Sequence, residues 1–273
     1  MKGSFIHALL GSQTKRQDTG LDRNVAPPNL STLANGTLFE TWRPKAHVLP
    51  PSNHIGDPCA HYVDPSTGSF HVGFLYSSDN VSGIAAGVTD DLVTYRDITS
   101  ETEPPVFITP GGVNDPVAVF DGSVIPIGIN GTPTLLYTSV AFLPIHFTIA
   151  YTKGSETQSL AVSYDGGKNF TKVPEGPVIP GPPYGSNALN VTAFRDPYVF
   201  QNSLFDRLLA SKNGTWYAAV SGGVHDVGPS QFLYRQYDPN FRDWEYLGQW
   251  WKEPVNSTWG SGEWAGRWAF VSG

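Results

Sequence analysis

Three aspartates in this sequence stand directly before a proline and a short apolar run: Asp57, Asp115 and Asp196. Pairs of carboxyl groups cleave glycosidic bonds, because one attacks or stabilises the cationic sugar while the other protonates the leaving oxygen. Asp-Pro is also an ordinary way to open a turn, and the chain contains five such pairs. The three aspartates are therefore candidates for glycoside chemistry if the fold brings them together.

A segment with Asp in a turn and an aromatic residue after it occurs three times, beginning at Thr89, Ser163 and Tyr237. The starts are 74 residues apart each time (163 − 89 and 237 − 163). These segments alternate with the Asp-Pro pairs and with strand-like runs, which is the rhythm of β-propeller blades, each a four-stranded antiparallel sheet. We expect the first strand of each blade to line the central axis, so that the three aspartates converge at one end of it.

The composition favours an all-β domain of short strands and tight turns. The 273 residues include 29 Gly and 23 Pro, and 15% are charged, which disfavours long helices. A net charge of −7 argues against nucleic acid and anionic membranes as partners and is compatible with a neutral sugar. No apolar run is long enough to span a membrane. We expect residues 1–40 to form a leader or arm with a weak signal-like start, and 41–273 to form the folded domain.

Sequons, cysteine and histidine bear on the compartment and on metal binding. The single cysteine, Cys59, permits no intrachain disulfide and leaves the compartment open. His54, His61 and His225 do not follow a standard metal-ligand spacing, so no metal and no cofactor are expected. Eight Asn-X-Ser/Thr sequons predict a secreted glycoprotein. They begin at Asn29, Asn35, Asn80, Asn130, Asn169, Asn190, Asn213 and Asn256.

Several segments, taken in chain order, carry the motifs of a known enzyme family. Residues 53–62, Asn-His-Ile-Gly-Asp-Pro-Cys-Ala-His-Tyr, are similar to a Trp-Met-Asn-Asp-Pro-Asn-Gly signature, and 194–197 contain an Arg-Asp-Pro motif. Residues 89–95 look like a Ser-X-Asp-Leu-X-X-Trp segment. Together with the stretch from Leu38 through Trp268, these motifs resemble glycoside hydrolase family 32, in its fungal invertase and fructosyltransferase branch.

The resemblance implies a five-bladed β-propeller followed by a β-sandwich. We expect the 273 residues to account for about three blades and the start of a fourth, without the sandwich. The resemblance makes Asp57 the nucleophile of a retaining double displacement on sucrose or fructo-oligosaccharides, and Asp196 the stabiliser of the transition state. It places six further residues at the substrate: Asn53, Leu75, Asp115, Arg195, Ile145 and His146.

The proton donor is where the sequence departs from the family. The resemblance implies a fourth-blade Glu after a segment like Trp264–Trp268, and none of the eight glutamates lies in a matching motif. Glu263 is nearest but precedes that segment. General acid catalysis contributes roughly 10²–10⁴-fold, so we expect this chain alone to turn over sucrose very slowly.

Three other functions remain open at this stage. A non-catalytic sugar-binding propeller, or pseudoenzyme fragment, is favoured by the unmatched Glu and disfavoured by the retained Asp57, Arg195 and Asp196. A sialidase- or arabinanase-type glycosidase is disfavoured because the few arginines do not recur at strand starts. A purely structural propeller is disfavoured by the sequons and the Asp-Pro series. The sequence does not separate hydrolysis from fructosyl transfer, and it leaves the oligomeric state unknown.

Overall fold

The computed structural model describes residues 54–77, 82–98, 106–146, 149–183, 189–252 and 254. All of them belong to one compact unit, Pro44–Gly273. The expected leader (1–40), the expected start of a fourth blade and the candidate residue Asn53 lie outside the described residues.

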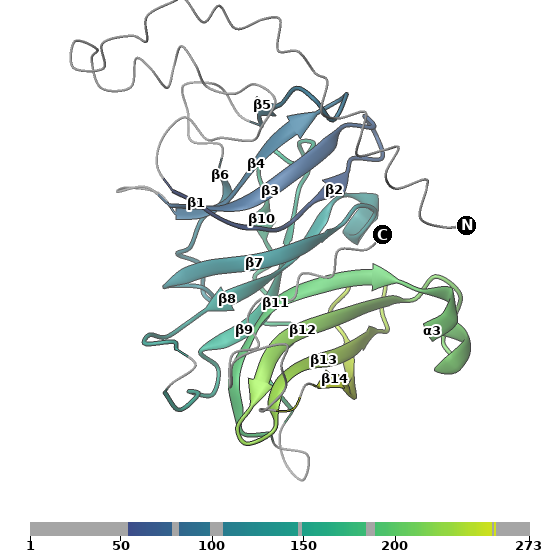
Figure 1. Ribbon diagram of the computed structural model, residues 1–273. Helices are drawn as coiled ribbons and strands as arrows, with labels where there is room; N and C mark the ends of the chain where they lie inside the picture. Colours follow the sequence, from purple (N-terminus) through teal and green to yellow (C-terminus); the bar gives the residue numbers. More distant parts are fainter. Residues whose placement is uncertain are drawn as a thin grey trace, which may run out of the picture. The chain divides into compact units, whose positions relative to one another are not determined.

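The described chain folds into three consecutive antiparallel sheets, which follow one another in space in chain order (Figure 1). The first contains β1 (His54–Pro58), β2 (Tyr62–Val63), β3 (Phe70–Ser77), β4 (Ser82–Thr89), β5 (Arg96–Asp97) and β6 (Val106–Ile108). The second runs from β7 (Ala118–Ile125) through β8 (Thr134–Val140) and β9 (Glu156–Val162) to β10 (Thr171–Lys172). The third contains β11 (Val191–Gln201), β12 (Trp216–Val224), β13 (Gly228–Gln236) and β14 (Trp244–Lys252).

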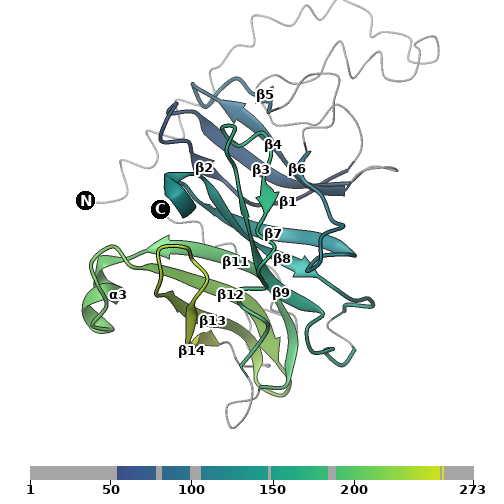
Figure 2. The same cartoon turned by 180° about the vertical axis from the view of Figure 1, so that it is seen from behind.

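Helix is confined, among the described residues, to two short pieces. They are the 3₁₀ turn η2 (Ile129–Gly131) and α3 (Ser203–Leu208), which lies beside the third sheet in both views (Figures 1 and 2). The prediction of an all-β chain of about three blades is confirmed.

The core is packed between successive sheets. Every residue of β8 and β9 is buried, because the second sheet is covered on both faces. Alternate side chains serve the two faces: Leu135 and Tyr137 pack toward the first sheet, whereas Leu136 and Leu160 pack toward the third. The second sheet is therefore the layer through which the first and third sheets are positioned.

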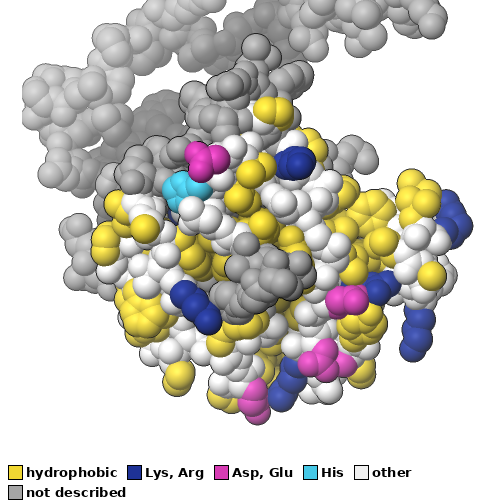
Figure 3. Space-filling view, turned by 90° about the horizontal axis from the view of Figure 1, so that it is seen from below, with side chains coloured by type: hydrophobic (Ala, Val, Ile, Leu, Met, Phe, Trp, Pro, Cys, Tyr) yellow, Lys and Arg dark blue, Asp and Glu magenta, His cyan; other side chains and the backbone are white. Residues whose placement is uncertain are grey.

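The far face of the third sheet is aromatic. Phe200 stacks on Tyr217 and on Trp250, with ring centroids 5.7 Å apart in each pair, and Phe205 of α3 meets Trp250 edge-on at 5.3 Å. Figure 3 views the molecule from this end and shows apolar patches among scattered charges. This face lies opposite the one that packs against the second sheet.

The three Asp-containing turns close hairpins at the outer strands, as the repeat predicts. Asp91 accepts backbone N–H bonds from Val93 and Thr94 at 2.8 and 2.7 Å, and Asp165 and Asp238 do the same in the second and third sheets. The aromatic residues that follow, Phe170 and Phe241, are buried between sheets. These local bonds fix the outer edge of each sheet and leave the inner strands free to carry the site.

Candidate active site

Each innermost strand carries an aspartate inside a β-bulge. The pairing register shifts between Ile55 and Pro58 in β1, between Val119 and Gly122 in β7, and between Arg195 and Tyr198 in β11. The acidic residues within these bulges are Asp57, Asp121 and Asp196, and all three are half-buried. A bulge turns a side chain away from the regular alternation of a strand. The same feature, an aspartate within a bulge, therefore occurs once in each sheet.

Backbone and side-chain bonds tie the three bulged strands to one another. The Ala60 N–H donates to the Gly122 carbonyl at 2.7 Å, which joins the first sheet to the second. The Ser123 hydroxyl donates to the Pro197 carbonyl at 2.8 Å, which joins the second sheet to the third. Both bonds lie within three residues of a bulge aspartate, so the spacing of the carboxyl groups is set by contacts between sheets.

Asp196 has the most perturbed electrostatics of the three. Loss of solvent around its carboxyl raises its pKa well above the usual range, and the negative charge of Asp121 raises it further. Arg195 opposes the shift, while Glu156 and Asp57 add to it. These four groups are the charged neighbours of Asp196, and carboxylates that crowd one another in this way cannot all ionise at once. Asp57 and Asp196, which the sequence predicts to act together, are thus close enough to interact.

Arg195 is fixed by a buried glutamate that sequence reasoning missed. Its Nε lies 2.5 Å from Glu156 Oε1, and its guanidinium lies 5.7 Å from the centre of the Phe120 ring. Glu156 is fully buried, which raises its pKa, and the positive charge of Arg195 opposes that effect. The Arg195 side chain as a whole keeps 19% exposure, so part of it remains accessible to a ligand.

Asp121 is the second residue that sequence reasoning missed. It hydrogen-bonds with the buried thiol of Cys59, whose pKa is raised by burial first and by Asp121 next. The thiol therefore stays neutral and serves as a donor. The signal was present in the sequence, since Asp121 interrupts an apolar strand and precedes Gly122, where a glycine inside a strand often marks a bulge.

Asp115, which was expected to line the substrate pocket, lies in the packing between the first and second sheets. It accepts bonds from the Gly112 N–H at 2.6 Å, the Tyr137 hydroxyl at 2.9 Å and Lys172 Nζ at 2.7 Å. The Asp115 carboxylate is thus fully buried with both oxygens engaged, and its expected place at the substrate stays a prediction. The half-buried carboxylate in the β7 bulge, which corresponds to Asp57 in β1 and Asp196 in β11, is Asp121.

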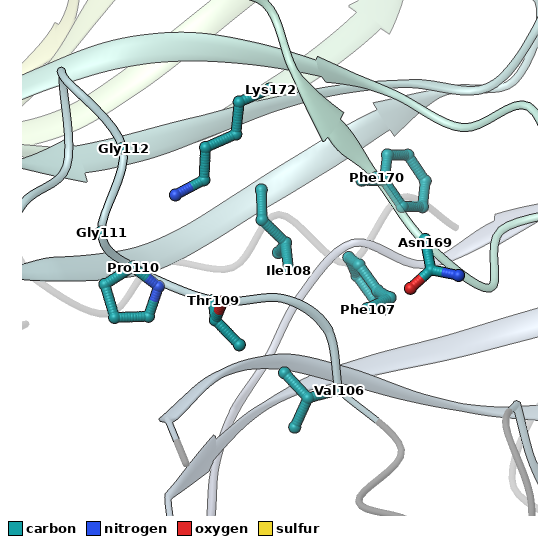
Figure 4. A pocket seen from close by; sticks show the side chains of 10 residues that line it. All are labelled: Val106, Phe107, Ile108, Thr109, Pro110, Gly111, Gly112, Asn169, Phe170 and Lys172. Carbon is teal, nitrogen blue, oxygen red and sulfur yellow. The ribbon is translucent and has the colours of Figure 1, made fainter.

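A pocket of about 370 Å³ lies next to Asp115 but contains none of the three bulge carboxylates. It is lined by 106–112 and by Asn169, Phe170 and Lys172. Figure 4 shows the Lys172 amino group reaching toward the Gly111–Gly112 turn. Because its lining belongs to the packing of β6 against β10, this pocket is separate from the candidate active site.

The remaining predicted residues fall around the bulges. Leu75 of β3 lies beside Gly56, where an added Cβ would come within 2.8 Å of the Leu75 Cβ, so the glycine lets β1 approach closely beside Asp57. Ile145 is half-buried and His146 is exposed. Both lie in the connection from β8 to β9, which ends at Glu156. Asn53 lies outside the described residues.

The described residues offer few groups for a metal or for proton transfer. No group of three or more His, Cys, Asp or Glu side chains among them is arranged to hold a metal ion. The described glutamates are Glu156, Glu175 and Glu245, and each is ion-paired with an arginine. In the same part of the chain no helix is long and apolar enough to cross a membrane.

The comparisons with known proteins agree on one family. The model of the glycosyl hydrolases family 32 N-terminal domain matches residues 47–264. The solved β-fructofuranosidase of Aspergillus kawachii, complexed with glycerol, is 70% identical, with a TM-score of 0.76 over 92% of this chain and 40% of that one. A fructosyltransferase from A. japonicus is 56% identical, with a TM-score of 0.75 over 88% and 40%. A Debaryomyces hansenii invertase is 28% identical over 211 residues, which are 72% of this chain and 36% of the invertase. The chain therefore spans well under half the length of these relatives.

Proposed function

Because this chain belongs to glycoside hydrolase family 32, we propose that it carries the nucleophile side of a retaining active site for β-fructosides such as sucrose and fructo-oligosaccharides. The observation that supports this most directly is the set of bulged inner strands, which brings Asp57 into the electrostatic reach of Asp196. We also propose that residues 41–273 form an incomplete propeller domain.

In the proposed reaction the Asp57 carboxylate attacks the anomeric carbon of the fructosyl unit. The bond to the leaving sugar breaks, its electron pair stays on the leaving oxygen, and that oxygen needs a proton from a general acid. Water or a second sugar then attacks the fructosyl ester, which gives hydrolysis or transfer, respectively, and regenerates Asp57.

The neighbours of Asp57 have supporting roles in this proposal. A carboxyl with a raised pKa, such as that of Asp196, holds its proton more readily and can donate a hydrogen bond to a sugar hydroxyl. Arg195 supplies a fixed cationic donor. Asp121 takes the binding role that was expected of Asp115, because it is the half-buried carboxylate of the second sheet. Leu75, Ile145, His146 and Asn53 stay proposed substrate contacts.

Protonation of the leaving oxygen needs a general acid, and no described residue matches the family motif for that group. The resemblance implies a Glu, and Glu156 is already engaged by Arg195 and by the Phe194 N–H. We therefore propose that the 273-residue chain alone turns over sucrose slowly. Its rate should be about 10²–10⁴-fold below that of a site with a general acid, because general acid catalysis usually contributes a factor of that size.

A fructosyl donor whose leaving group needs no proton, such as fructosyl fluoride, tests the nucleophile independently of the acid. We expect the chain to accumulate one fructosyl group on the peptide that contains Asp57, detected by mass spectrometry, and Asp57→Asn to remain unlabelled. Asp226→Asn, an exposed aspartate in the β12–β13 turn, is the matched control and should label normally. Absence of label on the wild-type chain would refute the proposal.

The alternative of a non-catalytic sugar-binding propeller predicts a different result from the same samples. The chain would then bind fructose in a calorimetric titration but form no covalent adduct with the activated donor. The observation that favours this alternative is the unmatched general acid.

We propose that the protein is secreted and glycosylated. The four sequons within the described residues, at Asn130, Asn169, Asn190 and Asn213, all have exposed asparagines. A glycan must point into solvent, so their exposure is compatible with a secretory route. Neither nucleic acid nor a membrane is proposed as a partner.

A further inference from the structure

Three fully buried polar side chains of the second sheet face the third sheet. They are Thr138 of β8 and Glu156 and Gln158 of β9, and each is 0% exposed. Their neighbours on the same face, Leu136 and Leu160, are apolar. Burying polar groups among apolar ones is costly unless every group is hydrogen-bonded, so the partners of these three residues are informative.

All three bind the same three-residue segment of β11. Glu156 Oε2 accepts the Phe194 N–H at 2.9 Å, and Gln158 Nε2 donates to the Phe194 carbonyl at 3.2 Å. Thr138 Oγ1 accepts the Asp196 N–H at 2.8 Å and donates its own proton to Gln158 Oε1 at 3.0 Å. The Arg195 side chain between them pairs with Glu156 Oε1.

The segment that they hold has an unusual backbone. Asp196 has φ of +58°, in the left-handed region that residues with a side chain rarely adopt. It also lies within the register shift between Arg195 and Tyr198. Such a conformation persists only where the surrounding structure determines it, and here the determining bonds come from another sheet. The direction of the Asp196 carboxyl depends on this backbone.

We propose that Thr138, Glu156 and Gln158 are positioning residues, which set the orientation of Arg195 and Asp196 for their role at the fructoside. This inference rests on the proposed function of the site. Thr138, Glu156 and Gln158 act through the β11 backbone and the Arg195 guanidinium, and they do not touch the substrate.

Thr138 allows the sharpest test, because Val has nearly its shape without the oxygen and Ser keeps the oxygen. Thr157→Val is the matched control: Thr157 lies between Glu156 and Gln158 on β9, is also buried, and bonds Ser139 on the opposite face. We expect Thr138→Val to slow labelling of Asp57 by fructosyl fluoride by about ten- to a hundredfold, the effect of misplacing a group by ~1 Å. Thr138→Ser should restore most of the rate, and Thr157→Val should stay within about twofold.

A second readout does not depend on fructoside chemistry. The Asp196 carboxyl carbon can be titrated by NMR in the full chain labelled at Asp. We expect Glu156→Gln to lower the pKa of Asp196, since the Glu156 charge raises it and Arg195 would be released toward Asp196. Thr138→Val should also change this titration, and Thr157→Val should leave it unchanged.

The two readouts separate failure of this inference from failure of the proposed function. If the wild-type chain takes no label but the Asp196 titration responds as expected, the proposed function fails and the positioning role stands. If Thr157→Val matches Thr138→Val in both readouts, or if the Asp196 titration ignores Thr138 and Glu156, the positioning role is refuted.

Discussion

The ion pair of Lys172 with Asp115 allows a direct test of whether Asp115 stabilises the fold. Asp115 is 0% exposed and the Lys172 side chain is 24% exposed. Substituting Lys172 with Met leaves a buried charge with two remaining donors, the Gly112 N–H and the Tyr137 hydroxyl. The chain spacing of the pair is 57 residues, so the bond joins β10 to the segment before β7.

The expected cost follows from burial. Removing one partner of a buried pair costs ~3–5 kcal/mol. We expect about 3 kcal/mol for Lys172→Met, at the lower end of that range, because the lysine is partly exposed and two donors remain. Asp115→Asn keeps a hydrogen-bonding side chain and lets the lysine move into water, so it should cost about 1–2 kcal/mol. The double variant should cost less than the sum, because the uncompensated charge is gone.

Urea unfolding followed by tryptophan fluorescence measures these free energies. Lys168→Met, an exposed lysine of the same hairpin, is the control and should stay within about 0.5 kcal/mol of wild type. A loss below about 1 kcal/mol for Lys172→Met, or additive single variants, would refute the structural assignment of Asp115. So would an Asp115→Asn variant of normal stability that binds fructose less tightly.

Two further predictions concern His71 in the first sheet and Asn202 beside the third sheet. Burial lowers the pKa of His71 in the folded chain, so the unfolded chain binds a proton there more readily. The free energy of unfolding is therefore unaffected by this histidine above about pH 6.5 and decreases as the pH falls below that value. His71→Phe should therefore reduce the loss of urea stability between pH 7 and pH 5, and an unchanged pH dependence would contradict the assignment. Asn202 caps α3 by accepting the N–H groups of Leu204 and Phe205, so Asn202→Ala should cost about 1 kcal/mol in the same urea assay. Asn202→Asp, which keeps the acceptor, should recover most of that loss.

The hairpin turns of this fold could be predicted from sequence because their causes are local. Asp91, Asp165 and Asp238 bind backbone N–H groups no more than five residues away. The aromatic residues after the second and third of these turns, Phe170 and Phe241, are buried in the packing between sheets. A repeat of 74 residues therefore identified the sheets and their order.

The choice between Asp115 and Asp121 could not be made in the same way. Both precede or occupy β7, and Asp115 has the proline that marks the other two candidates. Which of them reaches the central carboxylates depends on the register shift between Val119 and Gly122 and on Lys172, which arrives from a distant strand. Gly122 hints at the bulge of β7, but a long-range ion pair such as that of Lys172 with Asp115 leaves little trace in a single sequence. The Arg195–Asp196 pair, by contrast, is recognisable as part of a motif.

The site belongs to the junctions between sheets more than to any single blade. The Ala60–Gly122 bond joins the first two inner strands, and the Ser123–Pro197 bond joins the second and third. Glu156 adds a bond from β9, which is not an inner strand, to the arginine of β11. If one sheet were removed, its own bulge would be lost. The bulge in the neighbouring sheet would also lose the bond that fixes it. It follows that substitutions of Thr138 in β8 and of Glu156 or Gln158 in β9, strands that carry none of the three bulge aspartates, should alter the chemistry of Asp196.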